Sequence, residues 1–405
     1  VVVLAGKGNN GADGRAAVSG LSRRGVRCVV VDAADAPAEL PACDLVIDAA
    51  YGTGFRGSFD APEIDAPLVL AVDIPSGVDG DTGAVGGSPL AADATVTFAA
   101  LKPGLVIGDG RELAGVIDVA DIGLAVDGAS IHLVEDVDVA LWLPKRSPSS
   151  HKWETAVRVV AGSDGMTGAA SLTAAAAMRG GAGYVALGVP GAPSSLSAGP
   201  VEAVTDALPA VGWADAVLAN LGRFSALAVG PGLGRDEGTM AEVRRLVAAA
   251  DLPVVIDADG LAAYDKIDGA PFAQRAAATV LTPHDGEFAR LMGGPPGVDR
   301  IAACRELARR SGAVVLLKGS TTVVADPEGD VLLAASGSAR LATAGTGDVL
   351  TGIVAAFLAG GLLPDLAAAL AAHAHGSAAS LGPSVGLVAS DLVNLLPTYF
   401  DRVSA

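Results

Sequence analysis

A glycine-rich segment near the C-terminus has the composition of a phosphate site, with Ala-Thr-Ala-Gly-Thr-Gly-Asp-Val at residues 342–349. Its glycines leave backbone N–H groups open at the start of the apolar helix expected over residues 348–358, and such groups bind anions. Asp348 stands at the rim of this anion hole, where a carboxylate can accept the proton of a substrate hydroxyl as phosphate arrives. Helix N-capping is the alternative role for Asp348. The Gly-Thr-Gly directly before it favours catalysis, because capping needs no such cluster of donors.

Three other segments at expected strand ends could contribute to a nucleotide site. Gly-Pro-Gly-Leu-Gly at residues 230–234 follows an apolar strand and permits a ligand to approach the backbone closely. Thr-Pro-His-Asp-Gly-Glu at 282–287 places a histidine and a glutamate beyond another strand. Lys-Gly-Ser-Thr-Thr at 318–322 supplies one cation and three hydroxyls, which suit a phosphate or a ribose. Turn chemistry or surface charge could explain each segment alone, but four loops at strand ends favour a common site.

The N-terminal third carries a second set of polar loops. Gly-Lys-Gly-Asn-Asn-Gly-Ala-Asp-Gly at residues 6–14 joins an expected strand to an expected helix. Glycines permit close backbone approach, and the helix start offers N–H groups to phosphate. A purely geometric glycine turn is the alternative, but such a turn does not require the paired asparagines at the centre of the loop. We therefore expect a ligand at this turn.

Two carboxylates end expected buried strands in the same region. Asp48 begins Asp-Ala-Ala-Tyr-Gly-Thr-Gly-Phe-Arg-Gly, and Asp73 lies in Val-Asp-Ile-Pro-Ser-Gly. A carboxylate at the end of a buried strand is unfavourable unless it is paired, hydrogen-bonded or bound to a cation. With Asn10 and Ser76, these residues offer hard oxygen ligands that suit an alkali or alkaline-earth ion. Turn or helix capping is the alternative role for each aspartate alone.

The elements that must position these loops alternate between β-branched runs and helical stretches. In the first third the expected buried strands cover residues 1–5, 27–32, 45–48, 68–73 and 94–99, with a helix over 14–24. A second series of expected strands covers residues 156–162, 182–189, 226–230, 253–257, 279–282 and 313–317, with a hairpin-like pair at 321–326 and 331–335. The Pro- and Ser-rich residues 143–150 separate the two series. The pattern predicts two α/β domains, residues 1–143 and 144–405, the first of them Rossmann-like and doubly wound.

The composition limits the classes of partner. The 405 residues carry a formal net charge of −18, and so acidic a surface disfavours nucleic acid and anionic lipid. Mean hydropathy is +0.48, but no apolar run reaches the roughly 18 uninterrupted residues of a membrane-spanning helix. Cys28, Cys43 and Cys304 show no metal or redox spacing and indicate buried thiols in a reducing compartment. We expect a cytoplasmic protein that binds neither nucleic acid nor membrane.

The loops of the first domain resemble those of the NAD(P)H-hydrate epimerase domain, which read GxGNNGGDG, DxxxGTG and VDIPSG. The resemblance implies that the hydrated dinucleotide contacts Asn9, Asn10, Gly11, Ala12, Asp13, Gly52, Thr53, Gly54, Phe55, Arg56, Gly57, Ser58 and Asp73. It further implies potassium on Asn10, Asp48 and Ser76, with Lys102 in a family motif near the site. The family carries helices ahead of the first strand, whereas this sequence opens without Met directly on that strand. We therefore expect a Rossmann-like domain that is truncated at its N-terminus.

The loops of the second domain resemble those of the ADP- or ATP-dependent NAD(P)H-hydrate dehydratase, a member of the ribokinase-like fold. Supporting matches are His151-Lys152 and the glycine-rich residues 161–170 and 179–183. The catalytic residues implied are the base Asp348 and the anion hole of Gly345, Thr346 and Gly347. The implied substrate contacts are Ala169, Gly232, Gly234, His284 and Asp348. The implied adenine nucleotide contacts are Lys318, Gly319, Ser320, Thr321, Thr322 and Gly347.

Together the two resemblances imply a bifunctional enzyme that repairs hydrated NADH and NADPH. The first domain would interconvert the R- and S-forms, and the second would dehydrate the S-form at the expense of ADP or ATP, with Mg²⁺ on the donor phosphates. The expected cofactors are thus ADP or ATP, Mg²⁺ and K⁺, and a homo-oligomer is expected. Two departures from the family pattern concern the second domain: Trp153 follows His-Lys where the family has glycine, and residues 337–341 replace Gly-Asn-Pro-Gly-Met.

Two alternatives to this interpretation remain open. A ribokinase-like kinase of a small-molecule hydroxyl, such as a vitamin precursor, would explain Gly-Thr-Gly-Asp but not the paired asparagines of the first domain. The first domain could instead be a non-catalytic binding or scaffold module, against which its intact polar loops argue. The remaining histidines and tryptophans receive structural interpretations: His373 and His375 as packing or surface groups, and Trp142, Trp153 and Trp213 as core or interface residues.

Overall fold

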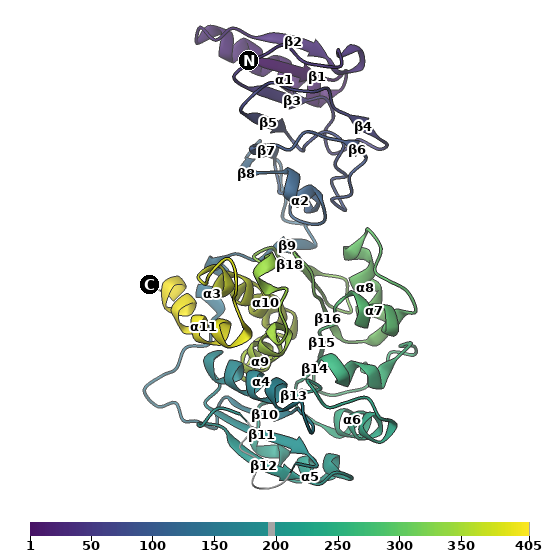
Figure 1. Ribbon diagram of the computed structural model, residues 1–405, viewed down its shortest axis with the longest axis vertical. Coiled ribbons are helices and arrows are strands. Elements are labelled where there is room, and N and C mark those ends of the chain that lie inside the picture. The colour runs from purple at the N-terminus through teal and green to yellow at the C-terminus, as the bar shows by residue number, and fades with distance from the viewer. Residues whose placement is uncertain (193–198, 405) are drawn as a thin grey trace. The chain divides into compact units, whose positions relative to one another are not determined.

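The computed structural model describes residues 1–192 and 199–404 and divides the chain into two compact units, residues 1–129 and 130–405. Figure 1 draws unit 1 in purple and blue and unit 2 in blue, teal, green and yellow. Each unit is built around its own largely parallel sheet. The α/β class expected from the sequence is therefore confirmed for both parts of the chain.

Unit 1 is a six-stranded parallel sheet in the order β2-β1-β3-β5-β7-β8. The strands of this sheet are β1 (Val2–Ala5), β2 (Val29–Asp32), β3 (Val46–Ala49), β5 (Val69–Val72), β7 (Ala94–Phe98) and β8 (Val116–Ala120). Strands β4 (Phe59–Asp60) and β6 (Gly87–Ser88) pair separately, and the helices are α1 (Asn9–Arg23) and α2 (Gly110–Leu113). The strand order reverses between β1 and β3, because β2 lies on one side of β1 and β3 on the other. A doubly wound sheet binds its ligand at such a switch point, beyond the carboxyl ends of the strands.

Two features of unit 1 differ from expectation. Strand β2 was expected to be buried, but it forms an edge of the sheet, and its Val29 and Val30 are 46% and 43% exposed. The helix expected to begin at Gly14 begins at Asn9, so the paired asparagines form its first turn rather than a loop. A side-chain carbon at Gly11 would collide with the carbonyl oxygen of Gly6. Gly11 thus allows the helix to start directly against the end of β1.

Unit 2 is a ten-stranded sheet in the order β12-β11-β10-β13-β14-β15-β16-β17-β18-β9, antiparallel only where β17 meets β16 and β18. Its strands are β9 (Ile131–Leu133), β10 (Ala156–Val160), β11 (Tyr184–Pro190), β12 (Val204–Leu208), β13 (Ala226–Val229), β14 (Val254–Ile256), β15 (Thr279–Leu281), β16 (Val314–Leu317), β17 (Thr322–Ala325) and β18 (Val331–Ala334). Its helices are α3 (Asp136–Trp142), α4 (Thr167–Arg179), α5 (Trp213–Leu218), α6 (Glu237–Ala249), α7 (Asp285–Met292), α8 (Arg300–Ser311), α9 (Thr346–Ala359), α10 (Pro364–Ser380) and α11 (Ala389–Ser404).

The helices of unit 2 form layers on both faces of its sheet, with α4, α9, α10 and α11 on one side and α6, α7 and α8 on the other (Figure 1). Small residues bring the central helices together. A side-chain carbon at Gly352 of α9 would collide with the carbonyl oxygen of Thr173 in α4, so these helices pack backbone against backbone. Alanine, valine and leucine fill the layer between helices and sheet. This close packing fixes the N-terminus of α9 relative to the strand ends.

The division between the units falls earlier in the chain than the expected boundary near residue 144. Strand β9 extends the second sheet beside β18, and α3 packs against α10 and α11. Val134 and Val139 of this segment are 5% and 0% exposed in the second core. Residues 130–143 therefore belong to unit 2, and the Pro/Ser-rich segment is a loop within that unit.

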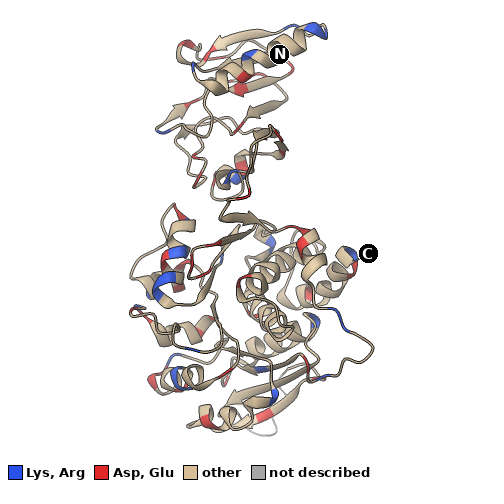
Figure 2. Ribbon diagram, turned by 180° about the vertical axis from the view of Figure 1, so that it is seen from behind, with Lys and Arg blue, Asp and Glu red and all other residues tan. Residues whose placement is uncertain are grey.

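The structure also locates the residues given structural interpretations. Trp213 is 1% exposed and lies in a core, whereas Trp142 is 48% exposed. Cys304 is buried as expected, but Cys28 and Cys43 are only partly buried. Lys and Arg are interspersed with Asp and Glu along the ribbon of both units (Figure 2). Among the described residues, no helix combines the length and apolar character needed to cross a membrane.

Candidate functional site

The Gly-Thr-Gly-Asp segment forms the first turn of α9. Gly345 is the N-cap residue in the left-handed conformation, with φ of 90°, and makes no side-chain cap hydrogen bond. Thr346, Gly347 and Asp348 are the first three helical residues, so the helix expected to begin at Asp348 begins two residues earlier. Asp348 is therefore not the N-cap, and the capping role considered for it is wrong. The free backbone amides of this turn point out of the helix start, as an anion site requires.

Buried hydrogen bonds hold this turn in place. The Thr346 hydroxyl donates to the carbonyls of Leu341 at 2.8 Å and Thr343 at 2.9 Å. His375 of α10 is 6% exposed, and its Nε2 lies 2.8 Å from the Thr346 carbonyl oxygen. Burial lowers the pKa of His375 to about 4, so the ring is neutral and its Nε2–H donates. His375 is thus an interior support of the anion hole, more specific than the packing role expected for it.

Asp348 is half-buried at the rim of this turn. Burial and the negative charge of Asp257 raise the pKa of Asp348 to about 6, against the opposing charge of Lys318. The carboxylate is ionised at neutral pH, yet its pKa lies close to that pH. A general base works best in this range, because it is both available and basic enough to take a proton.

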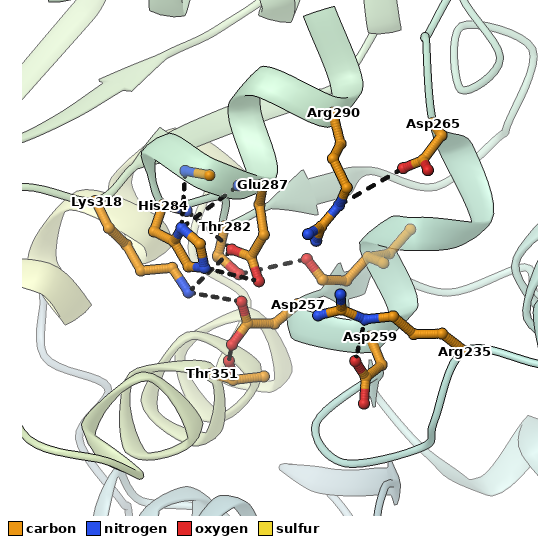
Figure 3. A network of polar contacts seen from close by, with 12 residues as sticks. Arg235, Asp257, Asp259, Asp265, Thr282, His284, Glu287, Arg290, Lys318 and Thr351 are labelled. Carbon is orange, nitrogen blue, oxygen red and sulfur yellow. Dashed lines mark hydrogen bonds and ion pairs between the residues drawn. The ribbon is translucent and has the colours of Figure 1, made fainter. Parts of the chain in front are cut away.

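Lys318 follows β16 and is mostly buried beneath the anion hole. Its Nζ lies 2.7 Å from Asp257 Oδ1 and 3.8 Å from Glu287 Oε2 (Figure 3). A side-chain carbon at Gly347 would lie 3.6 Å from the same ammonium nitrogen. The structure therefore places the one cation of the 318–322 segment in an ion-pair network beside the α9 turn, rather than on the surface.

His284 and Glu287 make a capping box at the start of α7. His284 Nδ1 accepts from Gly286 N at 2.9 Å and Glu287 N at 3.4 Å, and Glu287 Oε2 accepts from His284 N at 2.9 Å. This role was not anticipated from the sequence. Because Nδ1 accepts, the proton of a neutral ring sits on Nε2, which lies 3.5 Å from Glu287 Oε1. The box orients His284, whose side chain is 58% exposed (Figure 3).

The glycine loop at residues 230–234 meets the start of α4. A side-chain carbon at Gly232 would lie 3.1 Å from the Ala169 side chain, so two residues expected at the substrate are neighbours. Asp259 fixes the end of the loop, since its Oδ2 accepts from Gly234 N at 3.1 Å and its Oδ1 from Arg235 Nε at 2.6 Å. This arrangement leaves a glycine-lined surface beside the β13 end.

The segment at residues 318–322 turns from β16 into β17. Arg300 of α8 anchors it, because its Nη2 donates to the Lys318 carbonyl at 2.7 Å while its Nη1 lies 2.8 Å from Asp285 Oδ1. Gly337 approaches the Ser320 carbonyl so closely that a side chain there would collide. The segment that departs from the family pattern thus borders the turn expected to contact the nucleotide. Thr321 is buried, and Gly319 and Ser320 are exposed.

The structure adds polar residues to which the sequence interpretation gave no role in the site. They are Arg235, Asp257, Asp259, Arg300, Thr351 and His375. A signal existed for Asp257, since it ends an expected buried strand as Asp48 and Asp73 do. The others offered no signal, because their partners lie far away in sequence.

In unit 1 a cavity of about 640 Å³ opens at the switch point between β1 and β3. Expected substrate residues that line it are Asn9, Asn10, Asp13, Gly52, Thr53, Gly54, Phe55, Arg56 and Asp73, together with Lys102. Those outside its lining are Gly11, Ala12, Gly57 and Ser58. Gly11 is packed against the end of β1, and the carbonyl of Gly57 lies against Gly86.

Asp73 is the central charged group of this cavity. It adopts φ of 70°, a strained conformation for a residue with a side chain. Its Oδ1 lies 2.8 Å from Lys102 Nζ, and its Oδ2 accepts from the backbone and hydroxyl of Thr53. Burial alone would raise its pKa, but the bonds from Lys102 and Thr53 hold the pKa of Asp73 below its ordinary value. Asp73 is therefore ionised at neutral pH and forms part of the cavity lining.

Asp48 and Ser76 lie at the adjoining strand ends. Asp48 is 1% exposed and accepts from the Ser76 hydroxyl at 2.6 Å and Ser76 N at 2.8 Å. Burial nevertheless raises the pKa of Asp48. Asn10 is 9% exposed, and within the described part of the chain neither polar atom of its amide has a partner. Of the three residues expected to bind potassium, Asn10 lines the cavity, whereas Asp48 and Ser76 are not among its lining residues. A buried carboxylate and an unpaired amide oxygen are groups that a weakly hydrated cation could satisfy.

A further feature of the described residues concerns the ligand groups that divalent metals require. Across residues 1–192 and 199–404, no group of three or more His, Cys, Asp or Glu side chains is arranged to hold a metal ion.

The fold and sites define a two-unit α/β protein with a Rossmann-like unit and a ribokinase-like unit. Residues 157–397 match the family model described as NAD(P)H-hydrate dehydratase, and residues 30–104 match the YjeF-related protein N-terminus. A dehydratase from Bacillus subtilis, described as ADP/ATP-dependent and co-crystallised with ATP and Mg²⁺, is similar with a TM-score of 0.60 and 34% identity, covering 69% of this chain and 100% of that one. A ribokinase-like protein from Enterococcus faecalis, 21% identical, shares the fold with a TM-score of 0.59 over 69% of this chain and 99% of that one.

Relatives also match the chain across both units. The bifunctional NAD(P)H-hydrate repair enzyme of Moorella thermoacetica is 37% identical over 98% of this chain and 86% of its own length. The corresponding enzyme of Mycobacterium tuberculosis is 40% identical over 91% of this chain and 80% of its own length. The chain belongs to the family of bifunctional NAD(P)H-hydrate repair enzymes.

Proposed function

We propose that the chain repairs hydrated NADH and NADPH, with an epimerase site in unit 1 and an ADP- or ATP-dependent dehydratase site in unit 2. The observation that carries the proposal is the position of Asp348, a carboxylate of pKa about 6 beside the free amides of α9. A base and an anion hole at one point are what phosphoryl transfer to a hydroxyl requires. The polar cavity of unit 1 supports a second activity in the same chain.

In the dehydratase site, the nucleotide phosphates meet the amides of residues 345–347 and the hydroxyls of residues 319–322. A magnesium ion, when bound with the nucleotide, would supply positive charge against the donor phosphates. Asp348 accepts the proton of the substrate hydroxyl as its oxygen bonds to the transferred phosphorus and the donor P–O bond breaks. Phosphate then leaves with the C–O bonding electrons, and loss of a ring proton restores the double bond of NADH or NADPH. His284 and the glycine surface at Ala169 and Gly232 orient the dinucleotide.

In the epimerase site, Asp73 and Lys102 are the groups that can move a proton. Inversion at a carbon that carries both a hydroxyl and a ring nitrogen can proceed by ring opening. The hydroxyl loses its proton as a C=O forms and the C–N bond breaks with its electron pair on nitrogen; the nitrogen then closes on the opposite face of the carbonyl carbon, and the oxygen regains the proton. Asp73 is ionised and can accept that proton, while Lys102 at 2.8 Å keeps it so. The Asn9 and Asn10 amides at the start of α1 suit the dinucleotide phosphates and polar groups.

A potassium ion at Asn10, Asp48 and Ser76 would complete unit 1. The ion would offset the buried charge of Asp48 and give the unpaired Asn10 amide oxygen a partner. Its role would be structural, because these residues support the turn that bears Tyr51, whose backbone N–H donates to the Ser76 hydroxyl at 2.8 Å.

Epimerisation should therefore depend on potassium. We expect that exchanging K⁺ for a bulky organic cation slows epimerisation, and that Asp48→Asn removes most of the potassium dependence along with the activity. Dehydration, which belongs to unit 2, serves as the internal control on the same samples. An epimerisation rate that stays constant after exhaustive removal of K⁺ would show that the ion site is wrongly placed.

The alternative of a small-molecule kinase accounts for unit 2 alone. It predicts a stable phosphorylated product, whereas repair predicts release of phosphate and recovery of the nicotinamide absorbance. Incubation of the chain with the purified S-hydrate of NADH and ADP or ATP distinguishes the two. We expect one phosphate released per NADH formed, and no reaction without nucleotide. An accumulating phosphate ester would favour the kinase.

A further inference from the structure

The cation of the dehydratase site is held by a carboxylate that no sequence motif assigned. Asp257 follows β14 and is 1% exposed. Its Oδ1 accepts a hydrogen bond from Lys318 Nζ at 2.7 Å, and its Oδ2 accepts one from Thr351 Oγ1 at 2.5 Å (Figure 3). The carboxylate therefore links the end of β16 to helix α9.

Both hydrogen-bond partners of Asp257, Lys318 and Thr351, lie beside Gly347 of the anion hole. The Lys318 ammonium lies beside Gly347, within 3.6 Å of the point where a side-chain carbon of that residue would stand. The Thr351 hydroxyl lies 3.1 Å from the Gly347 carbonyl oxygen, one turn along the same helix. Movement of Asp257 would thus displace the cation relative to the amides that receive phosphate.

Resting on the proposed dehydratase function, we propose that Asp257 is a positioning residue that holds the Lys318 ammonium beside the anion hole and, through Thr351, fixes it relative to the helix that carries Asp348. Asp257 need not touch substrate in this role, since both of its oxygens are engaged and it is almost fully buried. A cation fixed in advance stabilises developing phosphate charge without a reorganisation step.

The charges of this network are maintained at neutral pH. Burial opposes the ionised form of Asp257, but the adjacent Lys318 charge outweighs it and lowers the pKa of Asp257. Burial likewise opposes the charged Lys318, but Asp257 and Glu287 raise the pKa of Lys318. The Lys318 ammonium and the Asp257 carboxylate therefore carry fixed opposite charges, which shift the pKa of Asp348 in opposite directions.

The groups that face Asp348 come from several elements. Those that shift its pKa, after burial itself, are Asp257, Lys318 and Asp259. Glu287 of α7 acts on Lys318, Arg235 pairs with Asp259, and His375 of α10 is neutral above a pKa of about 4. The other titratable groups on elements packed against α9 are Arg158, Arg179, Asp365, His373, Asp391, Tyr399, Asp401 and Arg402. Asp257 and Lys318 are thus the two charged groups that shift the pKa of Asp348 most, and removing either changes that pKa in a predictable direction.

The dehydration rate against pH tests the proposal in the full chain. Asp257→Asn removes a negative neighbour of Asp348, so the acidic limb of kcat should move to lower pH. Lys318→Met removes the positive neighbour, so the same limb should move to higher pH. Each variant should also lose roughly 10–100-fold in kcat, because small displacements of a fixed group cost about that much. Limbs that stay in place, or move in the same direction in both variants, overturn the proposal.

The hydrogen bond from Thr351 of α9 to Asp257 is tested by a matched pair of variants. Thr351→Val removes the hydroxyl and should lower kcat without a change in net charge, whereas Thr351→Ser keeps the hydroxyl and should behave like the unaltered chain. For Asp257→Asn the control is Glu306→Gln on α8, which removes a carboxylate that pairs with Arg309 away from the site. Equal rates for the valine and serine variants would show that Thr351 does not position Asp257.

Breaking a buried ion pair can prevent folding, because one charge is left without its partner. The double variant Asp257→Asn with Lys318→Met removes both charges and avoids that penalty. We expect it to fold, to return the acidic limb toward its original pH and to remain slow. A double variant with the full rate would contradict the positioning role. Inactivity of the unaltered chain toward the S-hydrate would instead contradict the proposed function itself, so the two failures are distinguishable.

Discussion

Asp348→Asn is expected to slow dehydration by about 10²–10⁴-fold, the usual contribution of a general base. Asparagine preserves the shape of the side chain but cannot accept the proton of the substrate hydroxyl at neutral pH. The helix start should remain intact, because Gly345 rather than Asp348 is its N-cap. In the unaltered chain the rate should fall as pH drops below about 6, since Asp348 is then protonated.

Three measurements on the same variant separate chemistry from folding. The rate of NADH formation from the S-hydrate should collapse, while affinity for ADP or ATP should change little because the amides of residues 345–347 and the hydroxyls of residues 319–322 remain. Epimerisation should also persist, as it belongs to unit 1. A nearly normal dehydration rate would rule out Asp348 as the base, and loss of all three properties would indicate misfolding.

Asp73→Asn is expected to have the second large effect, slowing epimerisation by about 10²–10⁴-fold if this carboxylate carries the proton. Asparagine can still accept from the Thr53 backbone, so the cavity should keep its form. It cannot hold a proton, and it removes the negative charge that pairs with Lys102 at 2.8 Å. The rate of exchange between the R- and S-hydrates, followed by chromatography, measures the effect.

Lys102→Met provides the comparison for this site. It removes the cation and leaves Asp73 ionised in a partly buried site, so we expect a smaller loss and an acidic limb moved to higher pH, because the pKa of Asp73 rises without Lys102. Dehydration of the pure S-hydrate should be normal in both variants. Full epimerase activity in Asp73→Asn would contradict the assignment of the base.

Much of this arrangement was predictable because parallel strands bring their carboxyl ends to one edge of a sheet. Loops recognised separately at residues 230–234, 282–287 and 318–322 therefore converge near α9 without any knowledge of their distances. The polar loops of unit 1 converge for the same reason at the point where the strand order reverses. Glycine patterns after apolar strands carry this information locally.

Pairings between distant residues were not predictable in this way. Lys318 reads as an exposed cation for phosphate, and only the folded chain brings it to Asp257, which lies 61 positions away. His375 lies on an alanine-rich helix, and its bond to Thr346 depends on how α10 packs against α9. Strand β9 joins the second sheet through pairing with β18, so a local change in composition could not locate the boundary between the units.

The most direct test of the account is complete conversion of a mixture of the R- and S-hydrates of NADH by the chain in the presence of ADP or ATP and potassium. Recovery of the NADH absorbance should continue until both forms are consumed, because unit 1 supplies the S-form as unit 2 removes it. With Asp73→Asn the recovery should slow sharply once the initial S-form is used, and with Asp348→Asn it should be almost absent. Recovery by the unaltered chain that ends at the initial S-fraction, or no recovery, would contradict the bifunctional account.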